Sequence, residues 1–204
     1  TRIETFNKPL KLDPTIIFTC SMSDFFHKQA DQWRDEAWEI IRKTPHHTYQ
    51  ILTKRPERVL ECLPEDWGDG YPNVWLGVSV GCNEPKSIKR IDILKLIPAK
   101  IKFISFEPLI EEINIKPEKI KGIDWVIIGG ESGKVKNGVP QYREAKPEWF
   151  RSLRDICKEA GALVWFKQAG THIARKYKMS GKGENLDQIP QDLRLRERPD
   201  LVKK

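Results

Sequence analysis

The chain has few of the features that mark secreted, metal-binding or membrane proteins. None of its cysteines forms a C-x-x-C pair; they are Cys20, Cys62, Cys82 and Cys157. This spacing predicts a protein of a reducing compartment, the cytoplasm, without a disulfide framework or a self-contained zinc site. The apolar runs, such as Trp125 to Ile128, are far shorter than the roughly 20 residues that a membrane helix needs. The first ten residues do not resemble a signal peptide, and we expect no contact with a membrane.

Charged and aromatic residues are plentiful. Charged residues make up 32% of the chain and hydrophobic residues 39%, with seven Trp and eight Phe, which excludes a disordered chain and a coiled coil. The 36 Lys and Arg against 29 Asp and Glu give a net charge of +7. Such a surface either attracts a polyanion or is simply well solvated. Nucleic acid is therefore a candidate partner, and nothing identifies a protein partner.

Six short apolar runs alternate with helical patterns. They are rich in β-branched and aromatic residues and are interpreted as buried parallel strands: Ile16–Thr19, Tyr49–Leu52, Val74–Val78, Lys102–Ser105, Trp125–Ile128 and Leu163–Phe166. Apolar residues at helical spacing, with proline or glycine at the ends, predict helices over Ala30–Arg42, Pro56–Leu63, Pro85–Ile97 and Pro147–Ala160. The alternation predicts an α/β protein, either a (β/α) barrel or partial barrel or an open doubly wound sheet.

The predicted domain covers residues 1–170, and residues 171–204 are expected to form an irregular extension over it. The ending, Arg194 to Lys204, has the composition of a polar tail. Within the first predicted helix, Trp33 and Trp38 are expected to pack against the sheet, because the pattern places both on the apolar face.

Polar residues follow each predicted strand. The carboxyl ends of parallel strands meet at one edge, where α/β enzymes place their sites, so these residues are the functional candidates. In chain order they are Ser23, Asp24, Lys54, Arg55, Ser79, Glu107, Gly129, Gly130, Glu131, Ser132, Lys167 and Gln168.

The carboxylates and cations of this set allow several chemistries. Asp24, Glu107 and Glu131 can hold a divalent cation, share acid–base work, or include a glycosidase pair. The cations after the strands either neutralise these carboxylates or hold an anionic substrate. The element Gly129–Gly130–Glu131 permits close approach of a ligand and offers an acceptor to an ammonium or ribose hydroxyl, but it also suits an ordinary turn.

Several segments together resemble a family found in phages and prophages and described as of unknown function. The matching stretches are SMSDFFH (21–27), LTKRPER (52–58), NVWLGVS (73–79), FEPL (106–109), residues 124–133 and FKQ (166–168). The family is similar to radical-SAM enzymes and carries a three-cysteine motif near its N-terminus. The resemblance implies a partial (β/α) barrel, with S-adenosylmethionine and a [4Fe-4S] cluster as cofactors. No three cysteines of this chain have that spacing, so the cluster ligands are absent from it and residues 1–170 are expected to lack the cluster-binding segment.

The leading hypothesis is a radical-SAM-like enzyme of unknown substrate, acting on nucleic acid or a nucleotide. From their positions after the strands, this hypothesis assigns catalysis to Asp24, Lys54, Glu107 and Lys167, cofactor binding to Gly129, Gly130, Glu131 and Ser132, and substrate binding to Ser23, Arg55, Ser79 and Gln168. No residue is assigned to a metal. The alternatives are a metal- or carboxylate-dependent hydrolase and a non-catalytic phage protein that binds nucleic acid.

Overall fold

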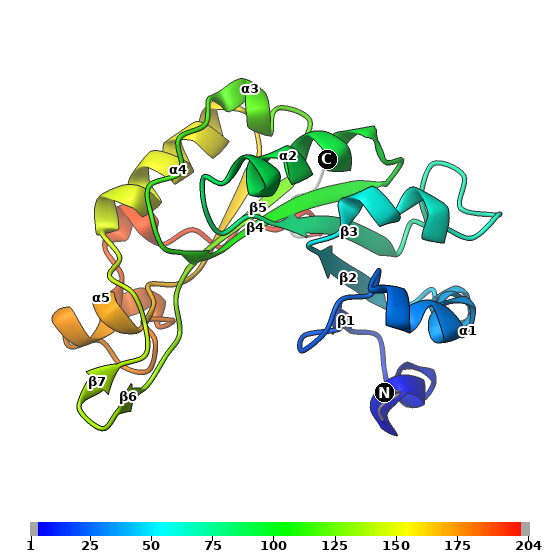
Figure 1. The fold of residues 1–204 in the computed structure, drawn as a ribbon, viewed down its shortest axis with the longest axis horizontal. Coiled ribbons are helices and arrows are strands. Elements are labelled where there is room, and N and C mark those ends of the chain that lie inside the picture. Colours follow the sequence, from blue (N-terminus) through cyan, green and yellow to red (C-terminus); the bar gives the residue numbers. More distant parts are fainter. Residues whose placement is uncertain (1–3, 201–204) are drawn as a thin grey trace.

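The computed structural model describes residues 4–200 and is built on a six-stranded sheet that curls into a half-barrel (Figure 1). Its strands are β1 (Ile16–Thr19), β2 (Thr48–Thr53), β3 (Val74–Ser79), β4 (Ile101–Leu109), β5 (Trp125–Gly130) and β8 (Leu163–Gln168). Every pairing in this sheet is parallel, which confirms the six predicted strands. The spatial order follows the chain without a reversal. A doubly wound sheet requires such a reversal, so the partial-barrel alternative is the correct one.

Three of the four predicted helices form. They are α1 (Asp31–Lys43), α2 (Pro85–Leu96) and α4 (Pro147–Glu159), and two shorter helices, α3 (Pro117–Ile120) and α5 (Thr171–Lys176), accompany them. Proline occupies the first turn of α2 and α4, where its missing N–H costs nothing. Figure 1 shows α2, α3 and α4 on the convex side of the arched sheet. Among residues 4–200, no helix combines the length and apolar character that a bilayer span requires.

The helix predicted over Pro56–Leu63 is wrong. This segment forms two separate 3₁₀ turns, Pro56–Arg58 and Leu60–Cys62. Val59 and Cys62 are buried while Leu60 is exposed, and a spacing of three suits the tighter 3₁₀ turn. The apolar residues of this segment therefore do not form one face of an α-helix.

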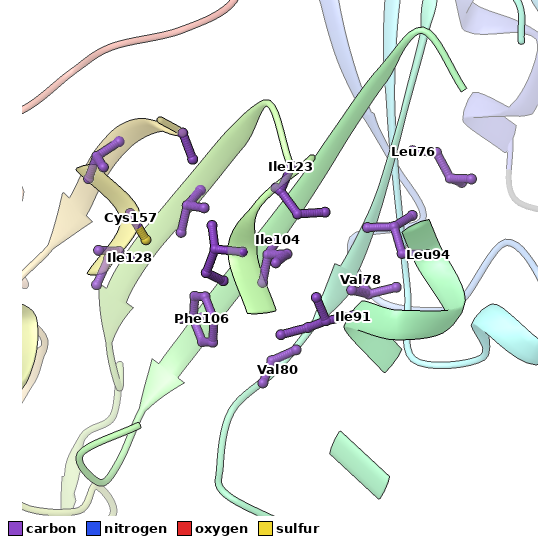
Figure 2. Close-up of a cluster of buried hydrophobic side chains, with 14 of the residues drawn as sticks. Leu76, Val78, Val80, Ile91, Leu94, Ile104, Phe106, Ile123, Ile128 and Cys157 are labelled. Carbon is purple, nitrogen blue, oxygen red and sulfur yellow. The ribbon is translucent and has the colours of Figure 1, made fainter. Parts of the chain in front are cut away.

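The main core lies between the sheet and the convex-side helices (Figure 2). Alternate residues of the strands, such as Val78 on β3 and Ile104 on β4, point toward Ile91 and Leu94 of α2. Trp38 of α1 is 1% exposed, and its Nε1 donates to the carbonyl of Cys62 at 2.8 Å.

The prediction for Trp33 is wrong. This residue is half-buried and lies outside the core cluster. Five residues of α-helix turn the chain by roughly 500°, which leaves Trp33 and Trp38 about 140° apart around the axis.

The opposite, concave face of the sheet carries its own aromatic cluster. Trp75, Phe103 and Trp125 are buried there against one another. The ring of Phe103 lies over Gly77, where a Cβ would come within 2.5 Å of the ring carbon Cζ. These aromatic residues fill the floor of the half-barrel.

The C-terminal extension is more ordered than its composition indicates. It begins with α5, and further along the chain the backbone N–H of Phe166 donates to Leu195 O at 2.8 Å and that of Glu197 donates to Val164 O at 3.0 Å. The predicted polar tail is therefore wrong for this stretch, which runs antiparallel beside β8. An edge strand leaves backbone groups unpaired, and this stretch pairs some of them. The last four predicted tail residues, 201–204, lie outside the described residues.

Candidate functional site

The predicted polar residues gather at the carboxyl edge of the sheet, but in three separate groups. Asp24 binds the end of β2, Glu107 pairs with Lys167, and Glu131 pairs with Arg143. Arg55 is the cation partner of Asp24, so each of the three carboxylates is paired with a different cation.

Asp24 ties the loop after β1 to the end of β2. Its Oδ1 accepts from Thr53 Oγ1 at 2.8 Å and from the backbone N–H of Phe26 at 3.0 Å. Its Oδ2 accepts from the backbone N–H of Lys54 at 2.9 Å and from Arg55 Nη1 at 3.0 Å. The side chain is 11% exposed. Four donors saturate a carboxylate, so this group organises the rim.

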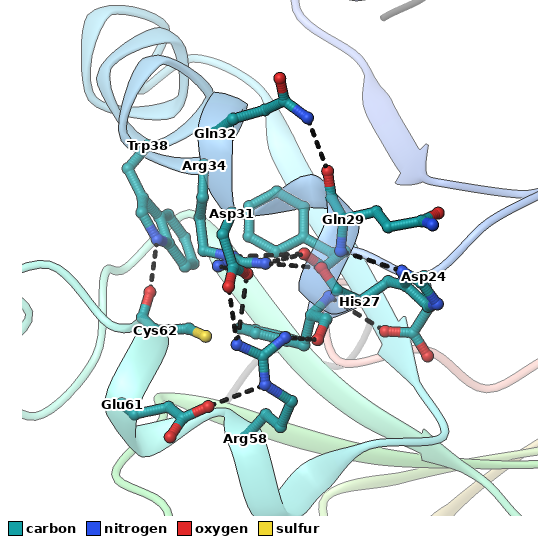
Figure 3. A network of polar contacts seen from close by, with 12 residues as sticks. Asp24, His27, Gln29, Asp31, Gln32, Arg34, Trp38, Arg58, Glu61 and Cys62 are labelled. Atoms are coloured by element: carbon teal, nitrogen blue, oxygen red, sulfur yellow. Dashed lines mark hydrogen bonds and ion pairs between the residues drawn. The ribbon is translucent and has the colours of Figure 1, made fainter. Parts of the chain in front are cut away.

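Two arginines hold the same loop, Arg34 from α1 and Arg58 from the 3₁₀ turn after β2 (Figure 3). Arg34, which is buried, donates to the carbonyls of Phe25 and His27, and Arg58 donates to that of Phe26 at 2.9 Å. Both arginines also bind Asp31, and hydrogen bonds from Arg58 first and Arg34 second lower the pKa of that carboxyl. The loop that carries Ser23 and Asp24 is thereby fixed to the domain.

Glu107 and Lys167 meet across the intervening strand β5. Lys167 Nζ lies 2.9 Å from Glu107 Oε2, while Oε1 receives no hydrogen bond from residues 4–200. The strand position between them is Gly129, where a Cβ would lie 3.0 Å from Glu107 Oε1. Glycine therefore leaves room for the pair and leaves one carboxylate oxygen open on the concave rim.

Glu131 is bound on both oxygens by Arg143. The backbone N–H and Nε of Arg143 donate to Oε2 at 2.6 and 3.0 Å, and its Nη2 donates to Oε1. The hydrogen bonds from the Arg143 side chain lower the pKa of Glu131. Arg143 is absent from the sequence-based set because it follows the small antiparallel hairpin of β6 (Val135–Lys136) and β7 (Val139–Pro140) rather than a strand of the main sheet.

The neighbouring residues join β5 to the chain after β8. A Cβ on Gly130 would come within 2.2 Å of the carbonyl oxygen of Ala169, so the two backbones touch here. Gln168 Nε2 donates to Gly130 O at 2.9 Å and to Ser132 Oγ at 2.7 Å. Roles of these residues toward a cofactor or substrate stay predictions.

Residues 4–200 contain no cluster of three or more His, Cys, Asp or Glu side chains that could hold a metal ion. The thiols are unpaired and scattered, and burial raises the pKa of Cys157 to about 12. A thiolate is needed to ligate iron, so this buried thiol is a poor ligand. The part of the chain that the structure describes thus does not fit an iron–sulfur cluster.

A fourth polar group lies on the concave face below the rim. Ser79 of β3 and Ser105 of β4 are register partners, and they are 5% and 3% exposed. Neither hydroxyl has a hydrogen-bond partner among residues 4–200. Ser79 is in the predicted set and Ser105 is not. The signal for Ser105 is a hydroxyl inside the apolar run from 101 to 106.

These features define a mixed α/β protein whose curled parallel half-barrel carries charged pairs at its carboxyl edge. A family model described as "Protein of unknown function (DUF5131)" matches residues 1–192. The chain therefore belongs to this family. No curated protein and no solved structure matches it.

Proposed function

We propose that this chain is a radical-SAM-like protein that binds S-adenosylmethionine on the concave rim and acts on a nucleotide or nucleic acid. The observation that carries the proposal is the Glu107–Lys167 pair at the carboxyl edge, with one carboxylate oxygen open. Enzymes built on parallel (β/α) barrels bind their ligands at this edge. The sequence resemblance supplies the reaction class.

The charges at this point suit the amino-acid end of S-adenosylmethionine. Its ammonium is a donor for Glu107 Oε1, and its carboxylate is an acceptor for Lys167 Nζ. The cofactor supplies an activated carbon–sulfur bond. Glu131, the carboxylate that the resemblance assigns to the cofactor, already binds Arg143 through both oxygens. We therefore assign the ammonium contact to Glu107 and keep Glu131 as the competing assignment.

Calorimetric titration with S-adenosylmethionine separates these assignments. The protein is the product of the complete gene, purified without oxygen, and its iron and sulfide are measured first. Glu107→Gln is expected to weaken binding about tenfold, since a hydrogen bond between charged groups is lost. Glu131→Gln is expected to bind as the parent does. Glu118→Gln, an exposed change on α3, is the matched control.

The outcomes distinguish the Glu107 assignment from the Glu131 assignment and test the proposal itself. Weaker binding by Glu131→Gln alone would move the cofactor to the Gly129–Gly130–Glu131 element. A protein without iron and without affinity for S-adenosylmethionine would overturn the proposal and favour the carboxylate-hydrolase alternative.

A further inference from the structure

The two unpartnered serine hydroxyls on the concave face have no structural task in the described chain. Buried hydroxyls normally have a hydrogen-bond partner, and Ser79 and Ser105 have none among residues 4–200. The fully enclosed side-chain atoms without partners in this part of the chain are Arg90 Nε and Arg196 Nε. Both serine hydroxyls therefore keep contact with solvent and can be reached by a ligand.

The hydroxyls lie side by side in a defined row. Ser79 and Ser105 are opposite one another in the parallel β3–β4 register, so they are separated by the strand spacing of about 5 Å. Phe103 lies two positions earlier on β4 and on the same face, and its ring covers Gly77, its register partner on β3. Glu107 follows two positions later, already neutralised by Lys167.

Two cations at this place have no carboxylate partner. Lys54 directly follows β2, one position beyond the register pair of Thr53 with Val78, and its exposed side chain makes no ion pair with the described residues. Arg90 of α2 donates from Nη1 to the carbonyl of Ser79 at 2.8 Å and also has no carboxylate partner in this part of the chain. Arg55 and Lys167, by contrast, are neutralised by Asp24 and Glu107. Lys54 and Arg90 are therefore the cations beside Ser79 that a ligand anion could neutralise.

We propose that Ser79, Ser105 and Lys54 form a phosphoryl-binding subsite, so that the substrate is a phosphate-bearing molecule. Two hydroxyl donors and an ammonium that arrive from different strands match a tetrahedral group with several acceptor oxygens. Arg90 adds favourable potential from behind β3. This inference rests on the proposed function for the rim being the active face, and it names the substrate class.

Titration with inorganic phosphate, uridine 5′-monophosphate and uridine, followed by calorimetry without S-adenosylmethionine, tests the subsite. We expect phosphate and the nucleotide to bind and uridine to bind at least tenfold more weakly than its phosphate. Ser79→Ala and Ser105→Ala should each weaken phosphate binding about tenfold, and Lys54→Met by a similar factor. Ser87→Ala, a buried serine of α2, and Lys121→Met, an exposed lysine before β5, are the matched controls.

Because the serine hydroxyls make no contact in the described chain, their removal should leave the melting temperature unchanged. Binding of phosphate that survives all three substitutions, or no binding of phosphate or nucleotide, would overturn the subsite. The subsite would also be overturned if the nucleotide bound tightly, inorganic phosphate did not bind, and Ser79→Ala bound the nucleotide as the parent does. That result would show that the protein recognises the base. If phosphate binds and S-adenosylmethionine does not, the cofactor assignment is refuted and the subsite stands. If S-adenosylmethionine binds and phosphate does not, the subsite is refuted and the cofactor assignment stands.

Discussion

Lys167 on β8 reaches Glu107 on β4 over the strand that separates them, and the pair is possible because the intervening residue is Gly129. A side chain at this position would lie against the Glu107 carboxylate. The next residue, Gly130, is required for another reason, since the backbone of Ala169 approaches it directly.

The two glycines should respond differently to alanine. In Gly130→Ala the new Cβ meets a carbonyl oxygen that cannot move cheaply, and we expect a loss of about 1–3 kcal/mol or more in the free energy of unfolding. In Gly129→Ala the contact is the end of a flexible glutamate, so the loss should be below about 1 kcal/mol. Urea unfolding of both variants checks this, and equal losses would show that the Glu107 side chain is held rigidly.

Trp38 is expected to be a main contributor to stability. Trp38→Ala removes a buried indole and its hydrogen bond to Cys62 O, and should lower the free energy of unfolding by about 3–5 kcal/mol. Trp33→Ala, on the same helix but outside the core cluster, should cost less than about half of that. Denaturant titrations of the two variants provide the comparison, and similar losses would mean that Trp33 also belongs to the core.

Most strands of the sheet could be predicted because burial on both faces makes them unbroken apolar runs, as in β3, where all six residues are buried. In β1 none of the four residues is buried, and Phe18 is 46% exposed. The choice between a half-barrel and a doubly wound sheet depends on the spatial order of the strands, which a local sequence pattern does not reveal. The hairpin formed by β6 (Val135–Lys136) and β7 (Val139–Pro140) was missed, although its turn is Asn137–Gly138. Both turn residues have positive φ, 50° and 77°, as an Asn-Gly hairpin requires.

The candidate site was predicted as a set of residues but not as a set of pairs. Register places Glu107 and Lys167 two strands apart, and their contact depends on a missing side chain at Gly129. Arg143 reaches Glu131 from beyond the hairpin, at a distance in sequence that no local pattern encodes. Long-range ion pairs of this kind are set by tertiary packing.

The attachment of the C-terminal extension should depend on pH through Asp192. A hydrogen bond from Arg151 of α4, followed in importance by that from Arg154, lowers the pKa of Asp192 from its ordinary 3.8 to about 2. Because the pKa is lower in the folded state, the stabilisation is complete above pH 3.8 and is lost as the pH falls toward 2. The side chain is 45% exposed, so solvent screening keeps the contribution below about 1 kcal/mol.

Urea unfolding of the parent and Asp192→Asn at pH 6, 4 and 2 measures this effect. The difference between them should be constant at the two higher values and shrink at the lowest. Asp187→Asn is the control, because the Asp187 carboxylate makes no ion pair among the described residues. If the difference in the free energy of unfolding were the same at pH 2, the charge of the Asp192 carboxylate would not be the cause of the stabilisation.

Asp24 should prove to be a stabilising residue whose removal unfolds the rim. Asp24→Ala deprives Thr53 Oγ1 and the backbone N–H of Lys54 of their acceptor, which should lower the free energy of unfolding by about 2–4 kcal/mol. Arg55 is half-exposed and can be solvated again, so it adds little. Asp35→Ala, an exposed change on α1, is the matched control.

The catalytic role predicted for Asp24 makes a different forecast, in which activity falls while stability does not. Thermal melts and phosphate titrations on the same samples, at a temperature where both proteins are folded, separate the two. If the loop is only displaced, phosphate binding should fall together with stability, because Asp24 positions the backbone of Lys54. An unchanged melting temperature of Asp24→Ala would contradict the stabilising role of Asp24 and would leave the fixing of the loop to Arg34 and Arg58.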